Sequence, residues 1–292
     1  MQDINIRDPY VLLHEGQYYM YGTRGPTTWG IADGFDCYVS SDLQNWSEPI
    51  EIFHNNGDFW ADRSYWAPEC YYYHGQFYLL ATFKSETSCL SMQVLKSDSP
   101  TGPFTLHSDG PITPPDWDCL DGTIYLDPQG KPFLVFSHSF QQNPKGEMCA
   151  VEFKNDLSSF NGPIKLLFTA ADAPWPVPFP NAKAIFGVDH DIYLSDGPCL
   201  YRTAEGSLLM LWSSFSSNGY SVGLSRSDNG QIDGNWIHEQ QPFFAENGGH
   251  GMIFRTKQDK LIFTMHYPND KYLEKPIFIF LKEENGTLVK DE

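Results

Sequence analysis

The feature that most constrains the fold of this chain is an internal repeat, which recurs five times along the 292 residues. Each copy opens on a polar residue, continues through two β-rich runs joined by a Gly- or Asp-containing turn, and ends on a third run. The five openings are IRDPYVLLHEGQYYMYGT, YWAPECYYYHGQFYLLAT, CLDGTIYLDPQGKPFLVFSH, LSDGPCLYRTAEGSLLMLWSS and GGHGMIFRTKQDKLIFTMH. Chance could produce two or three similar hairpins, but five in order that tile the chain indicate one repeated structural unit.

This repeat predicts an all-β fold, a single five-bladed β-propeller domain over residues 1–292, with four-stranded antiparallel blades around a central channel. Helical periodicity is essentially absent, and 21 prolines and 24 glycines separate the short strands. The mean period of about 58 residues is long for one blade. We therefore expect the excess length in loops at 54–66, 107–119 and the Pro-rich 172–190, which is a loop rather than a linker because the fourth repeat follows it directly.

The charge of the chain argues against two classes of partner. There are 19 basic and 37 acidic residues, which give a net charge of −18 at pH 7. Such a surface repels phosphate backbones and anionic lipid headgroups, so we expect neither nucleic acid nor a membrane as partner. The aromatic content of 15% favours a neutral oligosaccharide, since aromatic rings pack on apolar sugar faces, although aromatic residues also fill β cores.

The cysteines and the N-terminal segment bear on the cellular compartment. None of the six cysteines forms a C-x-x-C pair, which argues against a zinc site. The segment MQDINIRDPYVL has neither the basic start nor the apolar run of a signal peptide. We therefore expect a cytoplasmic protein with free, buried thiols, although a secreted protein trimmed at its N-terminus would look the same.

Polar residues begin the innermost strands of the predicted blades, and such positions converge around the axis at one face of a propeller. These residues are Asp8, Glu69 (or Ala67-Pro68), Asp121, Asp196 and His250. Taken singly, an aspartate before Gly or Pro is an ordinary turn residue, but three at matching positions favour a functional cluster. Carboxylates that face one another shift their pKa values apart, which can supply a proton donor and a base at one pH. His250 is either a packed core histidine or a ligand for a water or an ion.

Five motifs in this order resemble glycoside hydrolase family 43, whose members are five-bladed propellers and mostly arabinofuranosidases, xylosidases and arabinanases. The resemblance covers essentially the whole chain. The motifs are Arg7-Asp8-Pro9, Trp66-Ala67-Pro68, Asp121-Gly122, Asp196-Gly197-Pro198 and Gly249-His250-Gly251. The resemblance implies that Asp8 is the general base, that Asp196 is the general acid, and that Asp121 tunes the pKa of the acid and orients it. It also implies that no cofactor is required and that His250 lies on the axis, where some relatives hold a calcium ion.

Asp196 departs from the family pattern, which has a glutamate at this position. Aspartate is shorter by one methylene, about 1.5 Å of reach, and a misplacement of about 1 Å can cost on the order of 100-fold in rate. Three consequences are open: the backbone or sugar moves inward, the activity is weak, or another group donates the proton. Glu69 is the candidate substitute, and its alternative role is that of a polar residue after a structural turn.

The activity implied by the resemblance is inverting hydrolysis of a terminal pentose, with α-L-arabinofuranose as first choice and β-D-xylose as second. The length of the 172–190 loop favours exo action over endo action. We expect Trp29, Trp66, Trp117 and Glu69 to contact the sugar, although each tryptophan could equally serve loop packing. Two alternatives stay open. One is a glycan-binding propeller with weak or no activity. The other is a retaining fructosyl hydrolase, against which the chain lacks an NDPNG-like nucleophile motif and room for a C-terminal β-sandwich.

Overall fold

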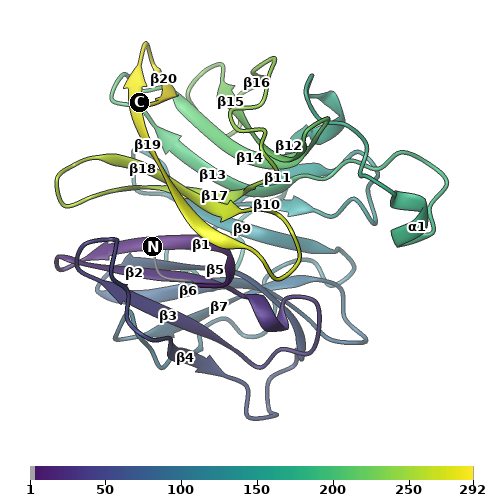
Figure 1. The fold of residues 1–292 in the computed structure, drawn as a ribbon. Helices are drawn as coiled ribbons and strands as arrows, with labels where there is room; N and C mark the ends of the chain where they lie inside the picture. Colours follow the sequence, from purple (N-terminus) through teal and green to yellow (C-terminus); the bar gives the residue numbers. More distant parts are fainter. Residues whose placement is uncertain (1–3, 292) are drawn as a thin grey trace.

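The computed structural model describes residues 4–291, and in this range it contains five four-stranded antiparallel sheets arranged as a ring (Figure 1). The four strands of each sheet are consecutive in the sequence and pair in that order, so each repeat folds as one blade. The predicted all-β, five-bladed β-propeller is therefore confirmed. Tight two-residue turns join strands where both residues adopt positive φ, as at Glu15-Gly16 and His74-Gly75, which matches the twist of antiparallel hairpins.

In each blade the strand numbers increase from the channel outwards. Blade 1 comprises β1 (Ile6–His14), β2 (Gln17–Arg24), β3 (Gly34–Ser40) and β4 (Ile50–His54). Blade 2 comprises β5 (Arg63–Tyr73), β6 (Gln76–Lys84), β7 (Ser91–Ser97) and β8 (Thr105–Leu106). Blade 3 comprises β9 (Cys119–Leu126), β10 (Pro132–His138), β11 (Glu147–Glu152) and β12 (Lys165–Thr169). Blade 4 comprises β13 (Asp196–Arg202), β14 (Leu208–Ser216), β15 (Gly219–Ser227) and β16 (Trp236–His238). Blade 5 comprises β17 (Gly249–Arg255), β18 (Leu261–Tyr267), β19 (Lys275–Glu284) and β20 (Thr287–Lys290).

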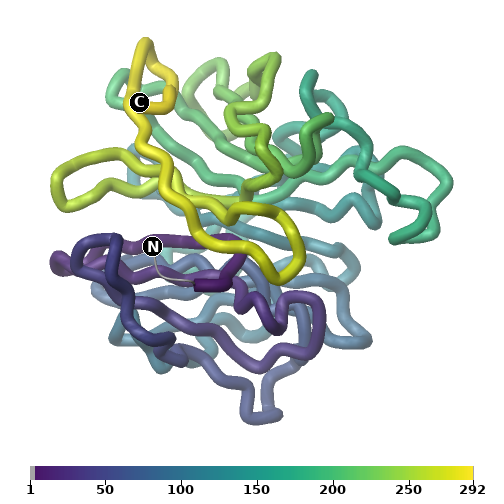
Figure 2. The backbone as a smooth tube through the Cα atoms, viewed as in Figure 1, coloured from purple at the N-terminus to yellow at the C-terminus, as the bar shows by residue number. Residues whose placement is uncertain are grey.

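The ring closes by packing of blade 5 against blade 1, because all four strands of the fifth sheet come from the C-terminal segment. Figure 2 shows the purple N-terminal segment beside the yellow C-terminal one. The Asn5 side-chain amide donates to the backbone oxygens of Tyr272 at 3.1 Å and Glu274 at 2.8 Å. Arg7 forms a buried ion pair with Glu274 at 2.8 Å. Polar contacts from the first strand and the residue before it therefore hold the two ends of the ring together.

The hydrophobic core lies mainly between neighbouring blades. One cluster joins blades 1 and 2, with Tyr21 and Phe83 fully buried, and another joins blades 3 and 4 around Trp212. Burial of a large apolar side chain stabilises the fold by about 1.5–3 kcal/mol, so these seams fix the angle between blades. The six cysteines are unpaired, as expected, and all except Cys89 are buried.

Long loops run from the outermost strand of one blade to the innermost strand of the next, as the excess period predicts. Two short helical turns, η2 (Ala170–Asp172) and α1 (Ala182–Phe186), lie at the start of the predicted loop 172–190 and within it, while η1 (Gly25–Thr27) follows β2. Phe179 and Phe186 anchor this loop against Phe140 of the third blade. None of the helices in the described part of the chain is long and apolar enough to cross a membrane.

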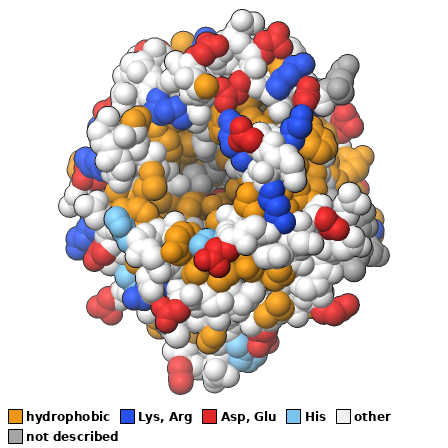
Figure 3. Space-filling model, turned by 90° about the vertical axis from the view of Figure 1, so that its left-hand side faces the viewer, with side chains coloured by type: hydrophobic (Ala, Val, Ile, Leu, Met, Phe, Trp, Pro, Cys, Tyr) orange, Lys and Arg blue, Asp and Glu red, His pale blue; other side chains and the backbone are white. Residues whose placement is uncertain are grey.

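The channel is visible from the face of the ring that lies away from α1. Figure 3 shows this face hollowed at its centre, with hydrophobic side chains around the hollow. The inner strands of all five blades run through the ring from the α1 side towards this face. Residues near the start of each inner strand therefore meet at the other end of the channel, on the α1 side of the ring. The long loops between blades lie on this same side.

Candidate active site

The first strand of every blade carries a bulge near its start, where the pairing register with the second strand shifts. At each bulge one residue adopts a left-handed backbone conformation, with φ between 45° and 54°. These residues are Asp8, Ala67, Asp121, Gly197 and His250. A left-handed conformation costs a non-glycine residue on the order of 1–3 kcal/mol and tends to occur at functional sites. Because a bulge re-aims its side chain, Asp8, Asp121 and His250 turn towards one another.

Two of the polar residues predicted to begin the inner strands, Glu69 and Asp196, do not occupy the left-handed position of their blades. In blade 2 the left-handed residue is Ala67, and Glu69 follows two residues later. In blade 4 it is Gly197, and Asp196 comes immediately before it. A Cβ atom at Gly197 would lie 2.6 Å from Cγ of His250, so the imidazole packs directly on this glycine. The blade-four carboxyl group therefore comes from the preceding residue.

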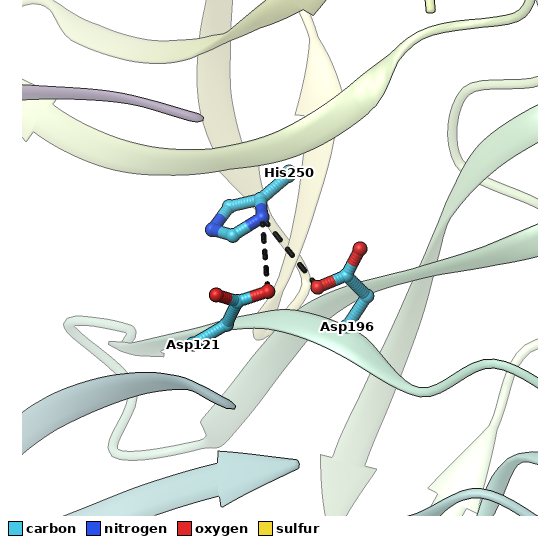
Figure 4. A group of neighbouring side chains, drawn as sticks. All are labelled: Asp121, Asp196 and His250. Atoms are coloured by element: carbon cyan, nitrogen blue, oxygen red, sulfur yellow. Dashed lines mark ion pairs between the residues drawn. The ribbon is translucent and has the colours of Figure 1, made fainter. Parts of the chain in front are cut away.

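Three carboxyl groups surround the imidazole of His250 (Figure 4 shows two of them). Nδ1 of His250 lies 3.3 Å from Oδ1 of Asp8, 3.6 Å from Oδ2 of Asp121 and 3.5 Å from Oδ1 of Asp196. The side chains of Asp8 and Asp121 are 7% exposed and that of Asp196 is 13% exposed. The structure thus brings these four residues of blades 1, 3, 4 and 5 into one site, whereas their catalytic roles stay predictions.

Asp8 lies in surroundings that favour its ionised form. The hydroxyl of Thr23 donates to Oδ2 of Asp8 at 2.6 Å, and its oxygen accepts the backbone N–H of Ala67 at 2.8 Å. Burial alone would raise the pKa of Asp8, but the neighbouring His250 and Arg7 counteract it, and the pKa lies well below the ordinary value. Asp8 is therefore a carboxylate at neutral pH, as a general base must be.

Asp121 and Asp196 form a pair that retains a proton, in contrast to the ionised Asp8. Burial, the negative charge of Asp196 and a hydrogen bond with it raise the pKa of Asp121 well above its ordinary value. Oδ1 of Asp196 is buried and accepts no hydrogen bond from a donor among residues 4–291, so a proton held by Asp121 is its natural partner. Two carboxyl groups this close titrate as a unit that keeps one proton. The site therefore contains a base and a proton donor at the same pH.

A second set of equivalent residues, which the repeat motifs did not single out, positions the bulges. In four of the five blades, a residue of the second strand accepts the backbone N–H of the left-handed residue in the following blade. These acceptors are Thr23, Thr82, Ser213 and His266. In blade 3 the hydroxyl of Ser137 instead donates to the backbone oxygen of Ser195 at 2.6 Å. These residues could have been found from the sequence, because each repeat opening ends at or next to one of them.

His266 links this set to Asp8 and to a further residue, Tyr220. Nε2 of His266 lies 3.2 Å from Oδ1 of Asn269, which already accepts from Arg7, so Nε2 carries the proton. Nδ1 can then accept the Asp8 backbone N–H at 3.3 Å. Burial and Arg7 lower the pKa of His266, which keeps the ring neutral.

Tyr220, on the third strand of blade 4, contacts the candidate acid directly. Its ring stacks on that of His266, with centroids 5.6 Å apart, and its hydroxyl donates to Oδ2 of Asp196 at 2.5 Å. Burial and the charge of Asp196 raise the pKa of Tyr220, so the hydroxyl stays protonated. No repeated motif marks Tyr220, which explains why it could not be predicted from the sequence.

The three predicted tryptophans lie in two places. Trp29 is 51% exposed and meets Trp66 edge to face at 5.8 Å, and the guanidinium of Arg7 lies 5.2 Å from the Trp29 ring. Trp29 and Trp66 therefore lie next to Arg7, the residue that precedes Asp8. Trp117 stacks separately on His138 of blade 3, with centroids 4.2 Å apart. Sugar contact by all three tryptophans stays a prediction.

Glu69 lies deeper in the channel than the acidic cluster. The groups that interact with it, Tyr10, Tyr71, Thr123 and Cys199, come from positions beyond the bulges of their strands. The hydroxyl of Tyr71 donates to the carboxyl group of Glu69. Burial raises the pKa of Glu69 to about 8, although this hydrogen bond opposes the shift. These surroundings favour a structural role for Glu69. That Glu69 acts as general acid in place of Asp196 stays a prediction.

Replacing Glu69 by glutamine should make the protein more stable in alkaline solution. The native state holds the Glu69 proton up to a pH of about 8, whereas the unfolded chain loses it near the ordinary pKa of 4.5. Wild-type stability therefore falls between these two pH values. At pH 9 we expect Glu69→Gln to unfold with a free energy about 3–5 kcal/mol larger than wild type, and at pH 4 with nearly the same free energy. Urea unfolding at both pH values measures this difference.

Glu283→Gln is the matched control for this experiment. Glu283 also accepts a tyrosine hydroxyl, that of Tyr201 at 2.5 Å. Burial would raise the pKa of Glu283, but its hydrogen bonds and the charge of Arg255 lower this pKa by more, so the pKa lies below the ordinary value. Its replacement should give no gain at pH 9. An equal response of the two variants would show that the pKa of Glu69 is not raised in the folded protein.

The residues of the cluster fit a bound cation. One ligand atom each from Asp121, Asp196 and His250 lie within 4.8 Å of one another, and all three residues are buried. Oδ1 of Asp196 has no hydrogen-bond donor among the described residues, so a cation could also complete its coordination. Carboxylate oxygens are the ligands that Ca²⁺ prefers. In their fully ionised form these three residues could therefore hold the calcium ion that the resemblance implies, whereas the form in which Asp121 and Asp196 share a proton leaves only His250 and one carboxylate charge to bind it.

Comparison with known proteins gives one family and several related structures. The family model for "Glycosyl hydrolases family 43" matches residues 3–279. The structure of an endo-arabinase from Bacteroides thetaiotaomicron superposes with a TM-score of 0.88 at 32% identity, covering 97% of this chain and 96% of that one. An extracellular endo-α-(1→5)-L-arabinanase of Bacillus subtilis is 25% identical over 45% of this chain, and an exo-α-(1→5)-L-arabinofuranosidase of Cellvibrio japonicus is 26% identical over 46%. These two matches span 42% and 41% of the relatives' own lengths.

Proposed function

The chain belongs to glycoside hydrolase family 43, and from this premise we propose that it hydrolyses α-L-arabinofuranosyl bonds of plant-type oligosaccharides with inversion of configuration. The observation that carries the proposal is the convergence of Asp8, Asp121 and Asp196 on the imidazole of His250. An ionised carboxylate beside a pair that keeps one proton is what an inverting glycosidase needs.

Asp8 is the general base in this mechanism. Its lowered pKa keeps it ionised at neutral pH, and the hydrogen bond from Thr23 fixes the orientation of its carboxylate. The carboxylate accepts a proton from a water molecule whose oxygen attacks the anomeric carbon. A new carbon–oxygen bond forms on the face of the ring opposite the departing group.

Asp196 is the general acid. As the glycosidic bond breaks, the departing oxygen takes the proton that Asp121 and Asp196 hold between them, and the pair becomes fully ionised. The raised pKa of Asp121 retains this proton at neutral pH, which is the role of a residue that tunes the acid. After the turnover, Asp8 carries the proton taken from water, and exchange with solvent restores both groups.

The substrate class follows from the relatives rather than from the shape of the site. The names of three relatives specify arabinan or arabinofuranose as substrate, so arabinofuranose stays the first choice and xylose the second. A panel of 4-nitrophenyl α-L-arabinofuranoside, β-D-xyloside and β-D-galactoside, together with α-1,5-linked arabino-oligosaccharides, tests this choice. We expect release from the arabinose-containing substrates. Activity on the xyloside or galactoside alone would overturn the choice, and no activity on any substrate would favour the glycan-binding alternative.

The mode of attack has two candidates, each favoured by one observation. The anchored loop at 172–190 borders one side of the site, since Phe179 packs on Phe215, a neighbour of Tyr220, and such a wall favours exo action. The endo-arabinase of Bacteroides thetaiotaomicron, 32% identical, favours endo action. Debranched arabinan separates the two modes. Exo action releases arabinose with little loss of viscosity, whereas endo action lowers the viscosity before arabinose accumulates.

A calcium ion at His250, where the resemblance places it, is part of the proposal as a structural element; direct ligation by both Asp121 and Asp196 would displace the proton that these two residues share. When bound, it would supply a fixed positive charge at the centre of the acidic cluster. Proton transfer itself is performed by the carboxyl groups. A calcium-dependent rise in melting temperature, abolished in His250→Ala but not in a variant outside the cluster, is the expected result.

A further inference from the structure

We propose that Tyr220 is a positioning residue for Asp196, and that its hydroxyl occupies the space into which a longer glutamate would extend its carboxyl group. The inference rests on the proposed function, because it assigns Tyr220 a part in the delivery of the proton. It also gives a reason for the aspartate at position 196, where the family pattern has glutamate. Tyr220 belongs to β15, outside all five motifs of the repeat.

The Tyr220 ring is fixed on three sides. It is 2% exposed, stacks on His266 with an interplanar angle of 13°, and contacts Phe215 with centroids 5.6 Å apart. Behind it, Gly249 leaves room that no other residue would leave, because a Cβ atom there would come within 2.7 Å of Cε1 of Tyr220. The hydroxyl therefore has one place to lie, at the Asp196 carboxyl group.

The two oxygens of Asp196 have different partners. Oδ1 lies 3.5 Å from Nδ1 of His250, on the side of the acidic cluster. Oδ2 accepts the Tyr220 hydroxyl at 2.5 Å. The Tyr220 hydroxyl therefore orients the Oδ2 side of the Asp196 carboxyl group. Without it, the Asp196 carboxyl group would be held on the side of the cluster alone, through Oδ1.

The same contact explains why aspartate fits. One additional methylene extends a carboxyl group by about 1.5 Å, which is more than half of the 2.5 Å that separates Oδ2 from the Tyr220 oxygen. A glutamate in the direction of Asp196 would therefore collide with the hydroxyl. The two residues form a matched pair, in which the short acid and the tyrosine together fill the length of a glutamate.

The first test is the replacement Tyr220→Phe, which keeps the stacked ring and removes the hydroxyl. With an arabino-oligosaccharide, whose departing oxygen needs a proton, kcat should fall by about 10- to 100-fold with little change in KM. With 4-nitrophenyl α-L-arabinofuranoside, whose nitrophenolate departs unaided, kcat should stay within about threefold of wild type. Equal losses on both substrates would mean that Tyr220 supports the structure alone and would overturn the inference.

The second test is a double-mutant cycle with Asp196→Glu. In the presence of Tyr220, the glutamate should be a poor acid, and Asp196→Glu should lower kcat on the oligosaccharide. The additional change Tyr220→Phe removes the obstructing hydroxyl, so the double variant should be at least about fivefold more active than Asp196→Glu alone. If the losses of the two single variants simply multiply in the double variant, the residues are not a matched pair and the proposal is wrong.

Tyr201→Phe is the matched control, because the Tyr201 hydroxyl also donates to a carboxylate, that of Glu283, at 2.5 Å in a contact away from the cluster. It should leave the kcat on both substrates unchanged. The failure of this inference is distinguishable from that of the proposed function. A wild-type protein inactive on both substrates would remove the proposed function, whereas an active one that is insensitive to Tyr220→Phe would remove the inference alone.

Discussion

Replacing Asp8 by asparagine should lower kcat on arabino-oligosaccharides by about 10³- to 10⁴-fold, because the attacking water loses its general base. The substitution is suited to the site. Asparagine tolerates the left-handed backbone (φ 54°) of this position, and its side-chain oxygen can still accept the Thr23 hydroxyl. KM should change little, since the variant keeps the shape of the residue. Unlike the loss in Tyr220→Phe, this loss should be equally large for the nitrophenyl substrate, because every leaving group needs the attacking water.

Asp259→Asn is the matched control for this variant. Asp259 has a left-handed backbone as well (φ 59°), but it is 83% exposed and pairs with Arg255 in the turn between β17 and β18. Its replacement should leave kcat unchanged. An Asp8→Asn protein that kept more than about one tenth of the wild-type kcat would show that Asp8 is not the base.

Replacing Asp121 by asparagine should change the pH dependence as well as the rate. In the wild type, burial and the charge of Asp196 raise the pKa of Asp121, so the pair keeps its proton through neutral pH. An amide at position 121 can neither hold this proton nor supply the negative charge that helps the pair to retain it. The alkaline limb of the kcat/KM profile should therefore move to lower pH. At pH 7 we expect a loss of about 10²- to 10³-fold.

The measurement is a profile of kcat/KM against pH for both proteins at one fixed calcium concentration. The acidic limb belongs to Asp8, whose pKa is lowered, so it should stay in place in Asp121→Asn. A uniform loss of rate with an unchanged alkaline limb would indicate that Asp121 only shapes the site. The Asp259→Asn control applies here too, since it should reproduce the wild-type profile.

The sequence predicts the fold from the repeat alone, because each copy carries its own hairpin and turn signals. It also predicts the residues that gather at the axis, since Asp8, Asp121 and His250 occupy the same position in their repeats. What it misses is the offset in blade 4. Gly197 takes the left-handed position there because His250 packs on it, and this contact between two blades leaves no mark in either repeat.

The supporting residues differ in how far they could be predicted. Thr23, Thr82 and His266 end their repeat openings and Ser213 is the last residue but one of its opening, so all four could be found from that shared position. Tyr220 could not, because its role depends on a stack with a ring from the neighbouring blade. The pKa differences within the cluster likewise depend on burial and on distances of a few ångström, which only the folded chain defines.

The configuration of the first sugar released tests the central claim most directly. Proton NMR during early hydrolysis of an α-L-arabinofuranosyl substrate distinguishes the two anomers before they equilibrate. Attack by a water activated at Asp8, with proton delivery from Asp196, predicts that β-L-arabinofuranose appears first. Initial appearance of the α anomer would mean that a carboxylate attacks the sugar itself, and would contradict the roles assigned to the three aspartates.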